Sequence, residues 1–288
     1  EACIYNFTRF SSNENVHKLT MKNKKSIETF LKWAVIYINE GRTKLFDPSE
    51  KYRYTFYHGN IESKGQYSDA KESVKTGTWI SYNRNGIVSE QSTYHDNLLN
   101  GPYTSYFEDG SIEATVNFKN GEKDGKYTRY HKNGAVRQTG TYTNGKENGE
   151  VKIMDESGNI ALIIQTKDGN INGKYTSFYG NGDVYYYQYF TNGKQDGKFE
   201  VFYPNKTLMK KGEYKDDEYD GEISYYYENG AKRSIENYSN KKQNGIQTEW
   251  YADGKIKCEY NTQAGAYVGS YKYYYNNGVL SDSILYDT

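Results

Sequence analysis

One residue type recurs at a fixed interval along most of this chain. From residue 77 onward, a glycine is found every 24 residues without any insertion or deletion. These glycines are Gly77, Gly101, Gly125, Gly149, Gly173, Gly197, Gly221, Gly245 and Gly269. Self-similarity at a fixed period of this size is the sequence signature of a repeat protein. Because each repeat packs mainly on its neighbours, the period favours an extended binding surface over a catalytic pocket.

Two turn signals divide each 24-residue unit into two short strands. The first is an Asn-Gly or Asp-Gly pair, such as Asn133-Gly134, which favours the positive φ angles of a tight hairpin turn. The second is a longer segment, such as residues 120–125, which we interpret as a turn that includes the leading glycine. The residues between the turns are rich in Tyr, Phe, Thr and Val, which favour strands. Each unit is therefore predicted to be one β-hairpin. The whole is predicted to be an all-β solenoid, an elongated, twisted sheet of stacked hairpins.

Large side chains recur at fixed positions in the units and predict where the sheet packs. One column lies two residues after each leading glycine and a second lies five residues after it, as at Tyr127 and Tyr130. A third column lies on the return strand, as at Val136. Successive side chains of a regular strand point to opposite faces. The spacing of three residues between the first two columns therefore predicts a β-bulge or a strong twist between them.

The composition argues against several classes of function. The 37 basic and 37 acidic residues give no net charge, whereas binding to nucleic acid or to anionic lipid needs a basic surface. The two cysteines, Cys3 and Cys258, and the four histidines show no metal-ligand spacing. We therefore expect a protein partner, with no nucleic acid, no strong membrane binding and no small-molecule substrate. We expect no cofactor, no metal and no catalytic residues, so the chain is not expected to be an enzyme.

The N-terminal segment differs from the rest of the chain because it carries no repeat. Apolar residues from Ile27 to Ile38 recur at helical spacing after a start signal at Ser26, and predict one helix over about residues 26–40. We expect this helix to cap the first hairpin, as repeat proteins require. The alternative is a docking helix for a partner. The predicted domains are a capping segment at 1–50, a degenerate repeat at 51–76 and nine 24-residue repeats at 77–288.

Departures from the repeat are the candidate partner-binding residues. One 24-residue repeat has aliphatic residues where the others have aromatic ones. In it, Leu162 and Ile164 share one face of a strand while Ile163 lies on the other. Apolar residues on both faces indicate a thicker local core or, alternatively, a contact patch. Tyrosines also occur in runs of three, which must occupy both faces, and exposed tyrosine is favoured at interfaces. Strand propensity is the alternative explanation for these runs. The candidate tyrosines are Tyr185, Tyr187, Tyr225, Tyr227, Tyr273 and Tyr275.

The recurring sequence resembles a known repeat. Its pattern is Asn-Gly-Lys-x-Asp-Gly-x-Tyr-x-x-Tyr-Tyr-x-Asn-Gly, seen here at residues 192–205 and followed by Lys206 where glycine is usual. It is similar to the MORN repeat, and more closely to the bacterial variant in YwqK-family antitoxin proteins. The resemblance covers residues 77–288. It implies protein binding, with toxin neutralisation proposed for the bacterial variant and membrane or cytoskeletal attachment in eukaryotic relatives.

Three functions stay open at this point. The leading hypothesis is a non-enzymatic scaffold that binds another protein as an accessory component of a bacterial cell-envelope or surface assembly. The chain begins at Glu1 without an initiator methionine, which favours an extracytoplasmic location, periplasm or cell surface, over the cytoplasm. The first alternative is an antitoxin or immunity protein that neutralises a partner toxin. The second is a MORN module that binds membrane surfaces, against which the zero net charge argues.

Overall fold

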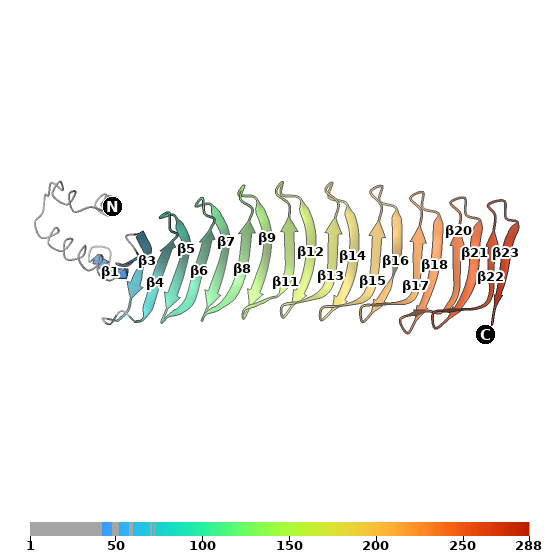
Figure 1. The fold of residues 1–288 in the computed structure, drawn as a ribbon. Coiled ribbons are helices and arrows are strands. Elements are labelled where there is room, and N and C mark those ends of the chain that lie inside the picture. The colour runs from blue at the N-terminus through green and yellow to red at the C-terminus, as the bar shows by residue number, and fades with distance from the viewer. Residues whose placement is uncertain (1–41, 48–51, 58–59, 70, 72, 288) are drawn as a thin grey trace, which may run out of the picture. The chain divides into compact units, whose positions relative to one another are not determined.

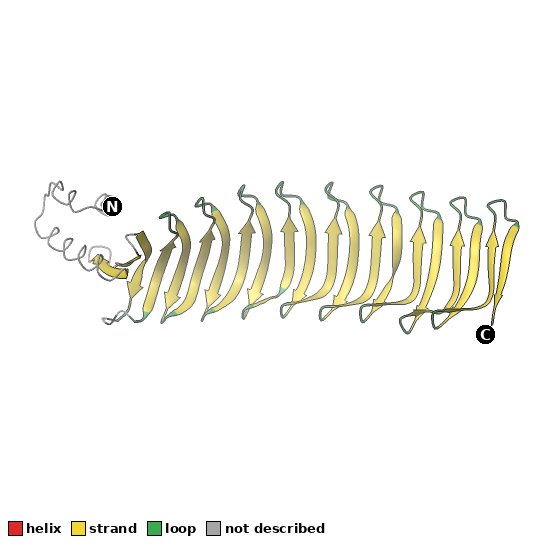
Figure 2. Cartoon of the chain, in the orientation of Figure 1, coloured by secondary structure: helices red, strands yellow, loops and turns green. Residues whose placement is uncertain are grey.

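The computed structural model describes residues 42–47, 52–57, 60–69, 71 and 73–287. Every regular element in these ranges is a β-strand (Figure 2), so the all-β prediction is confirmed. No helix that could cross a membrane is found in this described part of the chain. The helix predicted over residues 26–40 lies outside the described residues. The strands belong to two compact units, Glu1–Gly134 and Ala135–Thr288.

The first unit is an up-and-down sheet in which each strand pairs antiparallel with the next along the chain (Figure 1). Its strands are β1 (Arg42–Asp47), β2 (Tyr52–Tyr57), β3 (Asn60–Tyr67), β4 (Lys75–Tyr82), β5 (Val88–His95), β6 (Leu98–Tyr106), β7 (Ile112–Lys119) and β8 (Glu122–Tyr130). Strand β1 lies in the predicted capping segment, where the sequence indicated no strand. Strands β2 and β3 form a hairpin in the segment interpreted as a degenerate repeat.

The second unit continues the same antiparallel pattern of consecutive hairpins. Its strands are β9 (Val136–Thr143), β10 (Lys146–Glu147), β11 (Gly149–Met154), β12 (Ile160–Lys167), β13 (Asn170–Phe178), β14 (Val184–Thr191), β15 (Lys194–Phe202), β16 (Leu208–Lys215), β17 (Glu218–Tyr226), β18 (Lys232–Ser239), β19 (Lys242–Gln243), β20 (Gly245–Trp250), β21 (Ile256–Gln263), β22 (Ala266–Tyr274) and β23 (Leu280–Tyr286). Strands β10 and β11 both pair with β9, and β19 and β20 both pair with β18. Each of these pairs is therefore one strand with a short interruption.

The longer turn predicted at residues 120–125 is wrong. The turn consists of Asn120 and Gly121 alone, whose φ angles of 51° and 88° are those of a two-residue type I′ hairpin turn. Strand β8 begins directly after it, at Glu122. The leading glycine of this repeat, Gly125, lies within β8 at a φ of 97°, where the pairing with β7 shifts register. Only glycine adopts such a φ at low cost, so the glycine marks a β-bulge rather than a turn.

The turns at the other ends of the hairpins are longer than the Asn-Gly signal predicts. At Asn133-Gly134, only the glycine has a positive φ, of 84°. The N–H of Gly134 donates to the carbonyl of His131 over 2.9 Å. This bond closes a four-residue turn whose last residue is the left-handed glycine. This is the pattern of a hairpin loop built around a type I turn with one left-handed residue, rather than of a two-residue loop.

The irregularity predicted between the first two apolar columns is confirmed as a β-bulge. The pairing of β4 with β5 shifts between Ser81 and Tyr82, whose partners are Glu90 and Val88. The same shift recurs in later hairpins, for example between Ser177 and Phe178. One extra residue in the return strand thus changes the direction of the side chains that follow it.

Each unit buries one row of side chains on one face of its sheet, which we call the packed face. This central row crosses the strands, and in it lie Trp79 at 4% exposure, Phe199 at 2% and Ile223 at 0%. Large and small residues adjoin within the row, since Phe199 pairs with Gly212 and Trp79 with Ser92. A side chain at Gly212 would collide with Ile223. Burial of each large side chain contributes about 1.5–3 kcal/mol, so this row is the core of a sheet that, in its described part, no helix covers.

Lys206 occupies a loop position that glycine occupies in the neighbouring repeats. Its φ is 69°, compared with 87° at Gly182 and 84° at Gly230. A residue with a Cβ loses about 1–2 kcal/mol in this left-handed region, and the greater unfolded-state entropy of glycine offsets about 0.5–1 kcal/mol of that. The exposed ion pair between Lys206 and Asp183 contributes little. We therefore expect Lys206→Gly to raise the free energy of unfolding by about 0.5–1 kcal/mol, measured by urea denaturation.

The reverse change at Gly230 is the matched control. A Cβ there meets no atom within 4 Å, so strain of the backbone is the only expected cost. Gly230→Lys should lower the free energy of unfolding by an amount similar to the gain from Lys206→Gly. A loss of stability in Lys206→Gly would contradict the strain argument.

Candidate functional site

A second row on the packed face changes its chemistry from one repeat to the next. It lies two residues along each strand from the central row and therefore on the same face. In the second unit, unbroken cross-strand pairing connects Ile153, Leu162, Ser177, Tyr186, Val201, Lys210, Tyr225, Ser234, Glu249, Cys258 and Tyr273. We call this set, with its equivalents in the first unit, the variable row. Because stacking of the repeats does not dictate its residues, it is the part of the packed face that can carry specificity.

Three of the eight candidate binding residues lie in the variable row. These are Leu162, Tyr225 and Tyr273. Ile164 is on the same face but in the central row, where it pairs with Val151. The aliphatic repeat therefore contributes both to the core and to the variable row.

Tyr227 connects one repeat to the next. Its hydroxyl donates a hydrogen bond of 2.8 Å to the main-chain carbonyl of Trp250. The equivalent tyrosines make the same bond, from Tyr179 to Phe202, from Tyr203 to Tyr226 and from Tyr251 to Tyr274. Tyr275 has the equivalent position in the last repeat and is 56% exposed. The hydroxyl of Tyr227 is thus engaged within the fold, and the binding role of both residues stays a prediction.

Tyr185 and Tyr187 lie apart from the variable row. Tyr187 pairs with Thr176 and with Glu200, which places it on the face opposite the packed face. The ammonium of Lys174 lies 4.2 Å from the centre of its ring. Tyr185 lies where the pairing of β13 with β14 shifts register, and it is 43% exposed. The eight candidates therefore do not form one surface.

A cation among aromatic rings distinguishes the middle of the variable row in the second unit. The ammonium of Lys210 lies 4.7 Å from the ring centre of Tyr225, 4.5 Å from that of Tyr219 and 5.4 Å from that of Phe199. The guanidinium of Arg233 lies 5.2 Å from the Tyr225 ring. Burial, followed by the Glu236 carboxylate, raises the pKa of Tyr225 well above its usual value. Such cation–π contacts are worth about 0.5–2 kcal/mol each and hold the rings in place.

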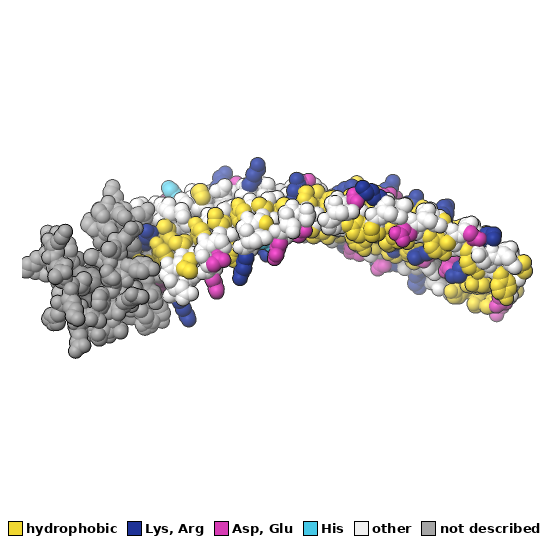
Figure 3. All heavy atoms as spheres, turned by 90° about the horizontal axis from the view of Figure 1, so that it is seen from above, with side chains coloured by type: hydrophobic (Ala, Val, Ile, Leu, Met, Phe, Trp, Pro, Cys, Tyr) yellow, Lys and Arg dark blue, Asp and Glu magenta, His cyan; other side chains and the backbone are white. Residues whose placement is uncertain are grey.

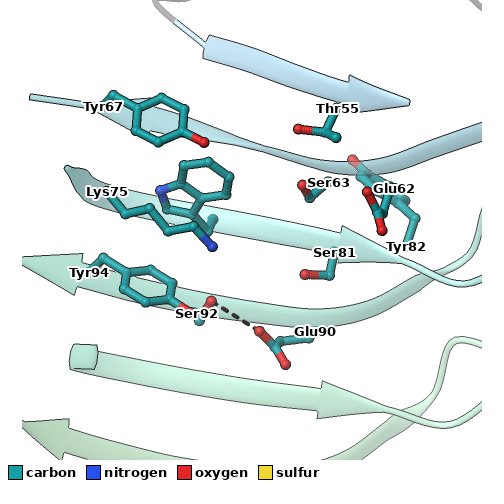
Figure 4. A pocket seen from close by; sticks show the side chains of 11 residues that line it. Thr55, Glu62, Ser63, Tyr67, Lys75, Ser81, Tyr82, Glu90, Ser92 and Tyr94 are labelled. Carbon is teal, nitrogen blue, oxygen red and sulfur yellow. Dashed lines mark hydrogen bonds between the residues drawn. The ribbon is translucent and has the colours of Figure 1, made fainter. Parts of the chain in front are cut away.

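The packed face of the first unit contains a hollow of about 460 Å³, lined by residues of β2, β3, β4 and β5 (Figure 4). Its two ends differ in chemistry. Figure 4 shows Tyr67, Lys75 and Tyr94 together at one end. At the other end lie two carboxylates and three hydroxyl groups, contributed by Glu62, Glu90, Thr55, Ser63 and Ser81. Sequence reasoning missed this hollow, although comparison of the repeats would have shown that the variable row is rich in hydroxyl groups here.

The aromatic end of the hollow is filled by the protein's own lysine. The ammonium of Lys75 lies 4.3 Å from the Trp79 ring and 5.0 Å from the Tyr94 ring. The Trp79 indole packs edge-on against Tyr67 with ring centres 5.0 Å apart, and its N–H donates to the carbonyl of Gln66 over 3.1 Å. These contacts place one positive charge over a nearly buried ring.

The other end of the hollow is dominated by Glu90. Its carboxylate accepts hydrogen bonds from the Ser92 hydroxyl at 3.3 Å and the Tyr103 hydroxyl at 3.1 Å. Ser92 is 1% exposed, so one of the two hydrogen-bond donors to this carboxylate is a buried hydroxyl group. Glu90 forms no ion pair with any residue that the structure describes.

The chemistry available at these sites is recognition by charge, hydrogen bonding and aromatic contact. The side chains that line the hollow include hydroxyl groups, two carboxylates and one lysine ammonium, but no histidine or cysteine. Within the described ranges, no group of three or more His, Cys, Asp or Glu side chains that could hold a metal ion is found. Figure 3 shows a surface of mixed chemistry, on which Lys, Arg, Asp and Glu side chains project beside hydrophobic ones.

The Glu90–Tyr103 bond predicts a measurable shift in ionisation. Burial is the largest cause, and Glu90 the next, of a Tyr103 pKa that is raised to about 12. Glu90→Gln removes the negative charge that disfavours the phenolate, so the pKa of Tyr103 should fall while staying above 10, because burial remains. The measurement is a pH titration by carbon NMR with tyrosine labelled at Cζ.

Glu113→Gln is the control for this titration, because the Glu113 carboxylate is a lesser cause of the same shift. It should lower the pKa of Tyr103 less than Glu90→Gln does. An unchanged pKa in Glu90→Gln would show that the carboxylate does not act on this hydroxyl.

A family model described as the MORN repeat variant matches this chain seven times. The matched residues are 75–96, 99–120, 123–144, 195–216, 219–240, 243–264 and 267–287. A search of curated proteins gives no match. Among solved structures, crystal structures of S. aureus TarM and of a TarM mutant in complex with fondaparinux, alpha-GlcNAc-glycerol and UDP show 14% identity and a TM-score of 0.27. They cover 50% of this chain but only 26% and 27% of the TarM chains, and a TM-score this low supports no conclusion.

The family matches agree with the hairpin architecture described above. Each match spans one hairpin, as residues 75–96 span β4 and β5, and successive matches are 24 residues apart within each run. MORN repeats are in general protein- or membrane-interaction modules. The closer resemblance to YwqK-family proteins stays a prediction. Together the matched segments make up more than half of the sequence, and the chain belongs to the MORN repeat variant family.

Proposed function

We propose that this chain is a non-enzymatic scaffold that binds a protein partner along the variable row of its packed face. In this proposal it serves as an accessory component of a bacterial cell-envelope or surface assembly. The observation that carries it is the contrast between two adjacent rows on one face. The central row is buried and supports the fold, whereas the variable row beside it changes its chemistry from one repeat to the next.

The chemistry of the variable row suits a protein surface. In the second unit it begins with the apolar Ile153 and Leu162, passes through Lys210 and Tyr225, and reaches the acidic Glu249. Protein interfaces combine an apolar and aromatic centre with polar and charged residues around it. Tyrosine in particular is enriched among the residues that dominate binding energy.

A face-specific capture experiment tests this proposal. The tagged full chain is used to capture proteins from its source organism, in parallel with Tyr225→Ser/Tyr273→Ser and with Tyr185→Ser/Tyr187→Ser. The first pair removes two rings from the variable row, and the second removes two rings that lie away from it. Loss of a hot-spot tyrosine costs about 2 kcal/mol or more, so the first variant should lose at least about ten-fold in affinity for the partner. The second variant should retain it.

The outcomes separate the functional hypotheses. Thermal unfolding checks that both variants are folded. Equal retention by both variants would exclude the variable row as the interface, and loss only in the second variant would move the interface away from it. Recovery of envelope or secretion components supports the accessory role. A single small protein with a toxin-like domain would support the antitoxin alternative, and recovery of lipid vesicles alone would support the membrane alternative.

A further inference from the structure

We propose that the hollow in the first unit receives a lysine or arginine side chain of a protein partner, with the Glu90 carboxylate as the counter-ion. The proposal rests on the protein-binding function above and adds the chemistry of one contact. It concerns the end of the hollow that contains carboxylates and hydroxyl groups, away from Lys75.

The charge of Glu90 is not balanced by any described residue. This carboxylate is half-buried, and both of its hydrogen-bond partners, Ser92 and Tyr103, are neutral hydroxyl groups. No cation among the described residues forms an ion pair with it. A charge that is partly removed from water without a partner is unfavourable, and an incoming cation relieves that cost. The two hydroxyl groups hold the carboxylate in a fixed orientation before the ligand arrives.

A set of hydroxyl groups lies beside Glu90. Thr55, Ser63 and Ser81 lie in the variable row on three successive strands and all line the hollow. Adjacent strands are about 4.8 Å apart, so these hydroxyl groups form a short ladder that leads to the carboxylate. None of the three makes a side-chain hydrogen bond to another described residue. A guanidinium has five N–H donors and an ammonium has three, and both need acceptors in such a place.

Lys75 occupies the opposite end of the hollow from Glu90. Lys75 lies on β4 with Ser81, the partner of Glu90, but forms no ion pair with Glu90. Its ammonium lies against the rings of Trp79 and Tyr94, so it repels a second cation from the aromatic end. A basic ligand is thereby directed to Glu90, and an acidic ligand is repelled there by Glu62 and Glu90.

The size of the hollow agrees with this occupant. A volume of about 460 Å³ is at the lower end of the range for ligand pockets. This volume can hold one long side chain from a partner's surface, but it is too small for a helix or a strand. The three hydroxyl-bearing residues and Glu90 are all half-buried, so part of each remains exposed to solvent.

The test uses three blocked tripeptides as probes and the full chain as receptor. The probes are acetyl-Gly-Arg-Gly-amide, acetyl-Gly-Lys-Gly-amide and the neutral acetyl-Gly-Gln-Gly-amide. Binding is followed by the NMR signal of the Trp79 indole N–H, which lies in the wall of the hollow. The arginine and lysine probes should produce saturable shifts with a Kd on the order of 1 mM. The glutamine probe should produce none.

Two charge-removing variants locate the contact. Glu90→Gln keeps the shape of the side chain and an acceptor for Tyr103, and should weaken binding of the basic probes about ten-fold, in line with a charge-assisted hydrogen bond. Glu113→Gln is the matched control, because Glu113 also accepts a serine hydrogen bond on this sheet but does not line the hollow. It should leave the affinity unchanged.

Three results would overturn the inference. They are equal shifts with the glutamine probe, no saturable shift with any probe, and equal weakening by both variants. The proposed function is tested separately by the capture experiment. If capture of a protein depends on Tyr225 and Tyr273 but the basic probes do not bind, this inference is refuted and the proposed function is not. Probe binding at Glu90 without capture of a protein would refute the proposed function instead.

Discussion

The burial of one row of side chains on a sheet is the interaction on which the rest of this structure depends. In the described part of each unit, no helix covers the packed face, so the core consists of what neighbouring strands place side by side. Phe199 and Ile223 reach almost complete burial because Gly212 lies between their strands and leaves space for both. A one-residue slip of any strand would turn its side chains to the other face. The number of residues in each strand is therefore fixed by the pairing on both of its sides.

Turns and bulges maintain that register. The type I′ turn at Asn120-Gly121 sets the pairing of β7 with β8, and the bulge at Gly125 then corrects the direction of the side chains before they reach the central row. In the second unit, hydrogen bonds such as the one from Tyr227 to Trp250 connect four of the hairpins to the following one. With the register held in this way, the residues of the variable row are left to differ. This is why Lys210 and Glu249 can share a row with Leu162 in the second unit without disturbing the core.

Features that depend on residues close in sequence could be predicted, and features that depend on distant residues could not. The hairpins, the column two residues after each leading glycine and the bulge that follows it could be predicted, because each depends on residues close in sequence. The return-strand column was wrong as a packing column, since Ile112, Ile256 and Leu280 are more than 40% exposed. The turn at 120–125 was misjudged because the signal for a left-handed glycine is the same in a turn and in a bulge. The candidate tyrosines lie on different surfaces of the sheet. A run such as Tyr185 to Tyr187 does not show which face each ring occupies. The hollow was missed because Thr55, Ser63 and Glu90 are far apart in sequence and adjoin only through three strand pairings.

The sequence by itself determined that this chain is a β-hairpin repeat with a 24-residue period, and that the column two residues after each leading glycine would pack. The reason is that periodic glycines and alternating side chains act through local backbone geometry. The tertiary structure decided which polar residues meet. Cross-strand pairing brought the hydroxyl groups of Thr55, Ser63 and Ser81 beside Glu90, and placed the ammonium of Lys210 among three aromatic rings. Charge and hydrogen bonding act over a few ångströms in space, and that proximity exists only once the strands are in register.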